Sequence, residues 1–299
     1  MIRNVVVKIY KYMQEHYLTF ILLVKLKELG ITRRINFYLS HSDDSTLRQT
    51  PNKEMLDSRH FFQKHMDIIE DNCRLLSDEK SKEVYKACIK YREYRETIPS
   101  ELYSEHDQYF VKDIIHLNDG EVFIDGGAYT GDTVQQFIDV SRESKVKKYK
   151  IIAFEPSSKY YLLIRKFFGN NRHVKIVKKG LSDDARKLHF NECGANSQIV
   201  EEGSKYTEVI ETTAIDKLKY NNKVTYIKMD IEGEEYNALQ GARNTIATYK
   251  PKLAICIYHS NEDMVRIIPF IHEIVPEYKL YIRHHSKSSV ETVLYAVLE

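Results

Sequence analysis

The chain has 299 residues, enough for two domains that each bury a core of ordinary size. Its 45 basic and 43 acidic side chains leave a formal net charge of +2, so no overall field points to nucleic acid or to a strongly acidic partner. The four cysteines form no CxxC pair and no Cys/His spacing suited to zinc, which indicates a reduced, cytoplasmic protein without a structural metal.

The first 40 residues are basic, with seven lysines and arginines against two glutamates. A segment of this kind is either a solvated helical face or a peripheral contact with a membrane surface or an anionic partner. The apolar run at 20–24 is far too short to cross a bilayer, and the pattern of a secretion signal is missing. We therefore expect a soluble protein made without export, with an oligomeric state that the sequence leaves open.

Residues up to about 105 have the periodicity of helices. The stretch at 61–76 places Phe62, Met66 and Ile69 on one face, and Ser77 is a suitable N-cap for the helix that follows.

A polar, proline-containing stretch at 40–53 is the best candidate for a linker. We expect a helical accessory region over residues 1–105 and a ligand-binding domain over residues 106–299.

Beyond residue 118, short apolar runs alternate with helical stretches. The runs lie at 121–125, 149–156, 173–182, 223–230 and 251–259. Strands that alternate with helices form βαβ units around a buried parallel sheet.

Two final apolar runs, at 278–285 and 291–299, are joined by a linker too short for a crossover helix, so they should pair antiparallel. The predicted fold is therefore Rossmann-like α/β, with a mostly parallel, seven-stranded, doubly wound sheet. The C-terminal antiparallel hairpin would form its one reversed edge.

The stretch VFIDGGAYTGDT, at 122–133, ends the first strand and begins a helix. In an open α/β sheet the ligand lies beyond the carboxyl ends of the strands, and this turn supplies its floor. Gly127 and Gly131 would let the backbone approach a ligand closely. The G-x-G-x-x-G spacing of a dinucleotide site is missing, and Asp125 would repel a diphosphate and attract a cation. A ligand with an amino group and a positive sulfonium fits better, which points to S-adenosylmethionine.

Acidic side chains also follow the next two strands. Glu155 ends the second strand, where its carboxylate could accept hydrogen bonds from both ribose hydroxyls of that cofactor. Asp183, just after the third strand, could accept from the adenine amino group, with Ser182 as the nearby alternative. One carboxylate at a strand end is weak support, because most acids are simply exposed, but acids at three consecutive strand ends form a stronger signal.

At this point the sequence resembles the FkbM family of S-adenosylmethionine-dependent methyltransferases. The resemblance covers roughly residues 106–299 and rests on VFIDGGAYTGDT, AFEPS, GLSD and above all YIKMDIEGEEYNALQGA, which looks like the K-x-D-x-E-G signature of that family. It implies a class I methyltransferase fold that transfers methyl to a hydroxyl, commonly on sugars of surface polysaccharides or on secondary metabolites. Tyr129 stands where many other methyltransferases have a glycine, as in relatives of this family, so we count it with the cofactor residues.

Methyl transfer to an alcohol requires alignment and a group that takes the hydroxyl proton. Lys228, Asp230 and Glu232 alternate on the way out of the fourth strand and so share one face. We expect Asp230 to face the sulfonium and the acceptor, with Lys228 orienting it, while Glu232 either joins them or caps the next helix. His259, directly after the fifth strand, is our first candidate for the base, because its ordinary pKa suits proton acceptance at cellular pH.

Tyr109 and Phe110 precede the first strand. They either close over the cofactor or form a buried aromatic pair that joins the helical region to the sheet. A metal-assisted variant would use Asp230 with magnesium, but the sequence does not supply a complete set of oxygen ligands, so we predict no metal.

The predicted function is an O-methyltransferase acting on a saccharide, such as a surface polysaccharide or glycan precursor, or on a related metabolite. The alternative is a catalytically inactive cofactor-binding module with the same fold that acts in protein interactions. An open cleft beside Asp230 and His259 favours the enzyme, whereas a cleft blocked by the helical region favours the module. The second domain has no basic stripe with interleaved aromatics, so we expect no nucleic-acid partner.

Overall fold

The computed structural model describes residues 53–191, 198–200, 205–218 and 223–298. The basic N-terminal segment and nearly all of the expected linker therefore lie outside the described residues. The expected domain boundary near residue 105 stays a prediction.

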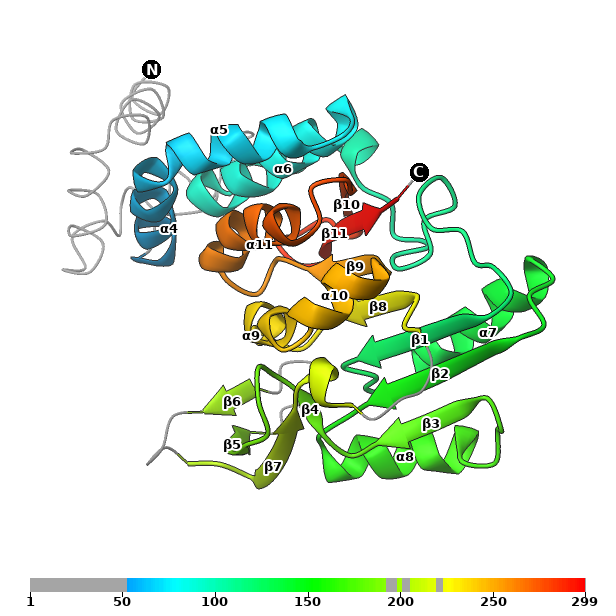
Figure 1. Ribbon diagram of the computed structural model, residues 1–299. Helices are drawn as coiled ribbons and strands as arrows, with labels where there is room; N and C mark the ends of the chain where they lie inside the picture. The colour runs from blue at the N-terminus through cyan, green and yellow to red at the C-terminus, as the bar shows by residue number, and fades with distance from the viewer. Residues whose placement is uncertain (1–52, 192–197, 201–204, 219–222, 299) are drawn as a thin grey trace, which may run out of the picture.

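A seven-stranded sheet forms the centre of the molecule, in the order β10-β11-β9-β8-β1-β2-β3 (Figure 1). Neighbouring strands run parallel except at β11, which is antiparallel to both β9 and β10. The predicted fold and its C-terminal hairpin are confirmed, but the reversed strand lies one place in from the edge. The strands are β1 (Glu121–Gly126), β2 (Tyr149–Phe154), β3 (Val174–Val177), β8 (Tyr226–Met229), β9 (Lys252–Cys256), β10 (Lys279–His284) and β11 (Thr292–Val297).

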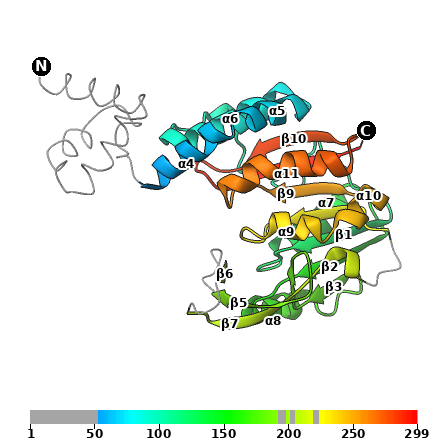
Figure 2. The same cartoon turned by 60° about the vertical axis from the view of Figure 1, so that its left-hand side comes forward.

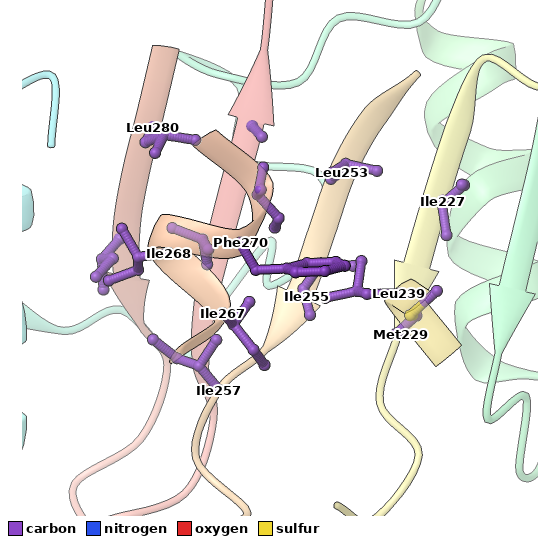
Figure 3. Packing of buried hydrophobic residues seen from close by; sticks show 14 of the residues in the cluster. Ile227, Met229, Leu239, Leu253, Ile255, Ile257, Ile267, Ile268, Phe270 and Leu280 are labelled. Carbon is purple, nitrogen blue, oxygen red and sulfur yellow. The ribbon is translucent and has the colours of Figure 1, made fainter. Parts of the chain in front are cut away.

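Helices cover both faces of this sheet, because alternate strand residues point to opposite sides. Ile227, Leu253 and Ile255 pack with the helices of one face, as Figure 3 shows, whereas Phe123 and Tyr226 belong to the core of the other. The first face carries α9 (Glu235–Gln240), α10 (Arg243–Tyr249) and α11 (Asn261–Ile274), and the second carries α7 (Asp132–Glu143) and α8 (Ser158–Phe168).

The N-terminal helices extend the core of the first face. They are α4 (Lys53–Lys64), α5 (Met66–Leu75) and α6 (Glu79–Tyr94), and α5 and α6 lie over α11 and β10 in both views (Figures 1 and 2). Two 3-10 helices are η2 (Ser100–Leu102) and η4 (Ile215–Lys217). None of the helices in the described ranges combines the length and apolarity needed to cross a membrane.

Two local predictions in this helical region are wrong. The helix expected over 61–76 breaks at His65, which turns Met66 outward, 44% exposed, while Phe62 and Ile69 are buried. The N-cap of α6 is Asp78, whose side chain accepts from the backbone N–H of Ser81 at 2.7 Å.

A second, four-stranded sheet was not predicted as such. It has the order β4-β7-β5-β6 and consists of β4 (Gly180–Leu181), β5 (Lys187–Asn191), β6 (Gln198–Val200) and β7 (Glu208–Thr213). The third apolar run, at 173–182, was expected to form one strand, but it divides into β3 of the large sheet and β4 of the small one. Figures 1 and 2 show this sheet at the opposite end of the molecule from α5 and α6.

Candidate active site

A cavity of about 510 Å³ lies at the carboxyl ends of β1, β2, β8 and β9. Its walls come from the loops after these strands, from the small sheet and from the loop between β10 and β11. The cavity is therefore where a doubly wound sheet is expected to bind its ligand. Of the residues that the structure describes, none before Gln108 lines it.

The turn after β1 brings Gly127 and Tyr129 to the cavity but not Gly131. Gly127 has φ +75°, and an added Cβ would lie 1.8 Å from the carbonyl oxygen of Asp230, so the glycine is required by the approach of the segment after β8. Gly131, at φ +86°, starts α7, and its Cβ would meet the ring of Phe168. The prediction that Gly131 makes room for a ligand is therefore wrong.

Tyr129 also has a left-handed backbone, with φ +43°. This explains why other methyltransferases could use glycine at the position. The centroids of the Tyr129 and Tyr160 rings lie 4.3 Å apart, and both residues line the cavity. The aromatic pair thus forms one wall of the site.

Asp125 is fully buried and does not line the cavity. Its Oδ1 lies 3.1 Å from Nζ of Lys228, its neighbour in register on β8. The cation that Asp125 attracts is therefore Lys228, which corrects the expectation that it binds the ligand.

Lys228 is a buried cation at the floor of the cavity. Its Nζ donates to the carbonyl oxygens of Gly126 and Gly127 at 3.0 and 2.8 Å. Burial acts to lower its pKa, but the carboxylates of Asp125 and Asp230 outweigh burial and raise it. Lys228 therefore stays charged and fixes the turn after β1.

Glu155 lines the cavity at the end of β2, as predicted. Its two oxygens accept from the backbone N–H groups of Tyr129 and Ser157, at 2.9 and 2.8 Å. Each oxygen has a further lone pair, so the carboxylate can also accept from a ligand. Burial raises the pKa of Glu155 to about 7.

Ser182 and Asp183 do not line the cavity, contrary to expectation. The Ser182 hydroxyl is buried between Asp183 and Glu234, with 3.1 Å from its Oγ to one oxygen of each, and Asp183 pairs with Arg186. This end of the cavity is instead lined by residues of the small sheet: Leu181, Phe190, Ile210 and Thr212.

Tyr109 and Phe110 have different roles: Tyr109 lies at the cavity and Phe110 lies in the core. Phe110 is 2% exposed and packs edge-on against Phe123 and Tyr226, so the expectation that it covers the cofactor is wrong. Tyr109 lines the cavity, and its hydroxyl donates to Oδ2 of Asp230 at 2.8 Å.

Asp230 is held from several sides. Tyr258 donates to its Oδ1 at 3.1 Å, and Nε2 of His259 lies 3.5 Å from the same oxygen. Burial acts to raise the pKa of Asp230, but the opposing effects of Lys228, His259 and the two tyrosine hydroxyls are larger. The pKa of Asp230 is therefore lowered from its ordinary value. The side chain is thus an ionised carboxylate that faces the cavity.

His259 is surrounded by carboxylates. Its Nδ1 lies 2.9 Å from Oε1 of Glu235, and its Nε2 lies 3.5 Å from Asp230 and from Glu232. Burial acts to lower the pKa of His259, but Glu235, followed by Asp230 and Glu232, raises it to about 9. In this state the imidazole is protonated at neutral pH.

Glu235 and Tyr258 were missed by sequence reasoning. The fully buried carboxylate of Glu235 accepts from the backbone N–H groups of Ile231 and Gly233, at 2.7 and 3.0 Å, and so holds the turn before α9 as well as His259. The run of acids in DIEGEE was a signal, but the partner of Glu235 lies 24 positions further along the chain.

Glu232 does not cap α9, whose N-cap is Glu234. It has φ +57° and lines the cavity, and burial raises its pKa to about 7. Of the two roles considered for Glu232, the structure supports the one in the site.

Among the residues that the structure describes, one group of side chains could hold a divalent cation. Ligand atoms of Asp230, Glu235 and His259 all lie within 4.8 Å of one another. No spacing in the sequence marks this group, because His259 comes from the next strand. Glu235 already accepts from two backbone N–H groups, however, which leaves it few lone pairs for a metal.

In a comparison with protein families, residues 125–281 match the methyltransferase FkbM domain. Among solved structures, methyltransferase FkbM from Methylobacillus flagellatus is similar, with a TM-score of 0.68 and 24% identity over 82% of this chain. The match covers 62% of that structure's length and shows the same fold. A search among curated proteins gave no match.

Two more distant structures are similar at lower scores. Fibrillarin from Aeropyrum pernix, with natively bound S-adenosyl-L-methionine, has a TM-score of 0.39 at 12% identity, over 62% of this chain and 71% of its own. An rRNA methylase from Streptococcus thermophilus has a TM-score of 0.39 at 10% identity, over 61% of this chain and 90% of its own. At these scores neither adds to the assignment.

Proposed function

The chain belongs to the FkbM methyltransferase family, and from that premise we propose that it transfers methyl to a hydroxyl group of a saccharide or a related metabolite. Its cofactor is S-adenosylmethionine. The proposal of a hydroxyl acceptor is supported by the site. An ionised carboxylate, Asp230, and an imidazole, His259, lie side by side in a cavity that Glu155 also lines.

The polar and apolar groups that line the cavity suit this cofactor. Glu155 is a buried carboxylate with lone pairs left for ribose hydroxyls, and Asp230 offers a negative charge to a sulfonium. The apolar side chains of Leu181, Phe190 and Ile210 provide a wall for an uncharged ring. When bound, S-adenosylmethionine supplies a methyl carbon that is already activated for displacement by its positive sulfur.

The remaining task of the protein is to take the proton of the acceptor hydroxyl. His259 is the side chain that we assign to it. Its pKa falls when a further positive charge enters the cavity, because like charges disfavour protonation. The neutral imidazole can then accept the proton at Nε2 while Glu235 holds Nδ1 and so fixes the ring.

The alternative function, an inactive cofactor-binding module, has less support. A cavity blocked by the helical region would favour it. None of the described residues from 53 to 107 lines the cavity, and both Asp230 and His259 do. The open site favours an enzyme.

The test is calorimetric titration with S-adenosylmethionine and with NAD, followed by transfer of labelled methyl to a panel of saccharides. We expect binding of the sulfonium compound, no binding of NAD, and loss of transfer in Asp230→Asn. Binding of NAD alone would contradict the cofactor assignment. Transfer that persists in Asp230→Asn would contradict the proposed role of the carboxylate.

A further inference from the structure

Two carboxylates of the cavity lack a permanent counter-charge. Glu232 lies in the loop after β8, and Glu291 lies directly before β11; both line the cavity. Within the described residues, neither forms an ion pair with a lysine or an arginine. Glu291 accepts from the side-chain amide of Gln108, which is uncharged.

The surrounding charges do not balance these two groups. Lys228 contacts Asp125 and also acts on Asp230, so within the described part of the chain His259 is the cation that forms ion pairs with Glu232 and Glu235. Burial raises the pKa of both Glu232 and Glu291, and the charge of Asp230 adds to this effect, whereas His259 acts to lower both values. A methyl donor with one net positive charge would leave this end of the cavity negative.

An independent feature also points to a ligand at this end. The side chain of His259 is 10% exposed, and its Nε2 has no hydrogen-bond partner in the described part of the chain. The nitrogen lies 3.5 Å from Asp230 and from Glu232, which is longer than a normal hydrogen bond. The imidazole therefore has charged partners at this nitrogen but no hydrogen bond of normal length to them, which leaves Glu232 with acceptor capacity for a polar ligand group.

We propose that Glu232 and Glu291 bind an ammonium group of the acceptor, which is therefore an amino sugar or another amine that also carries the hydroxyl to be methylated. This rests on the proposed function, since it names the acceptor class of the same site. An ammonium group donates three hydrogen bonds in different directions, which suits carboxylates that come from two separate loops. A divalent metal is less suited, because Glu235 is already occupied by Ile231 and Gly233.

The test compares two sugars that differ in one charge. Glucosamine and N-acetylglucosamine are titrated near pH 7 into the full chain loaded with S-adenosylhomocysteine, and into the chain alone. We expect glucosamine to bind about tenfold more tightly or better, as for a charged hydrogen bond. Glu232→Gln and Glu291→Gln should each remove most of this preference. Glu143→Gln, an exposed change at the far end of α7, is the matched control and should keep it.

Three results would overturn the proposal: equal binding of the two sugars, a preference that survives in the double variant, or no binding of glucosamine at millimolar concentration. Tight binding of Mg²⁺ or Mn²⁺ that is lost in Glu232→Gln and Glu291→Gln would also overturn it, in favour of a metal site. Failure to bind S-adenosylmethionine would instead sink the proposed function. The two failures are distinguishable, because the sugar comparison is also made without cofactor.

Discussion

At the scale of single residues, Glu155 is the group on which cofactor affinity most depends. Glu155→Gln should weaken binding of S-adenosylmethionine by roughly 1.5 to 3 kcal/mol, the range for hydrogen bonds to a charged group. The pKa of Glu155 is about 7, so wild-type affinity should rise as the pH passes upward through 7 and the carboxylate ionises. Calorimetry across this pH range checks both statements. A variant with the affinity and pH profile of wild type would show that the ribose lies elsewhere.

His259 should matter for turnover and not for cofactor binding. His259→Ala should lower the rate of methyl transfer by about 10²- to 10⁴-fold, the usual contribution of a general base. Cofactor affinity, measured by calorimetry, should stay within a few-fold of wild type. A fully active variant would exclude His259 as the base.

Glu235 acts through His259 and is a positioning residue. It is the leading cause that raises the histidine pKa to about 9 against the opposing effect of burial. Glu235→Gln keeps the shape of the side chain but removes its charge, so NMR titration should find the pKa of His259 closer to its ordinary value near 6.5. An unchanged titration would mean that Asp230 and Glu232 suffice.

At the scale of elements, the site depends on how closely β1 approaches β8. Gly127→Ala would force a Cβ into the carbonyl of Asp230 at a backbone angle that side chains rarely adopt. Gly120 offers a matched control, because its φ is +94° but nothing lies within 4 Å of an added Cβ.

We expect Gly120→Ala to cost about 1 to 2 kcal/mol in the free energy of unfolding, for the left-handed backbone alone. Gly127→Ala should cost more than about 3 kcal/mol, because it adds a backbone clash. Denaturant unfolding of both variants measures the difference. Equal costs would show that β1 and β8 separate easily.

Residues with a positive φ occur both at helix ends and in the loops of the cavity. Arg95 and Lys250 have positive φ at helix C-caps, where it is usual. Tyr129, Glu232 and Glu291 have it in loops that line the cavity. Strain of this kind costs on the order of 1 to 3 kcal/mol per residue and tends to occur at functional sites, which agrees with the roles that we assign to these loops.

At the scale of the whole molecule, the buried charges make stability depend on pH. His259 has its pKa raised from 6.5 to about 9, so its stabilising contribution is complete below pH 6.5 and is lost as the pH rises through 9. The loss is roughly 3 kcal/mol at most. Unfolding by denaturant between pH 7 and 9 should find stability falling in wild type and a flatter profile in His259→Ala. Parallel profiles would contradict the raised pKa.

Below pH 7 opposing groups overlap. Glu93, Glu155 and Glu232 have pKa values raised to about 7, so their ionisation destabilises the fold as the pH rises from 4.5 to 7. His284 has its pKa lowered to about 4 by burial, so it favours the fold above pH 6.5 and loses that effect as the pH falls. Above pH 7 these effects level off, and the comparison with His259→Ala separates what remains of them from the contribution of His259.

The sequence by itself determined the alternation of strands and helices, the C-terminal hairpin and the family, because these depend on local periodicity and on contiguous motifs. It also located Glu155, Asp230 and His259, since the carboxyl ends of parallel strands meet at one edge of a sheet. It did not reveal the small sheet, whose strands have only two to six residues and little periodicity.

Only the tertiary structure decided which polar groups share the cavity. The register of β1 and β8 places Asp125 opposite Lys228, where the two side chains form a buried ion pair away from the ligand site. Phe110 is buried in the core. The partnership of Glu235 with His259, and the place of Glu291 in the same wall, join segments far apart in the chain. Charges interact through space and not along the sequence, so their partners become known only when the fold sets the distances.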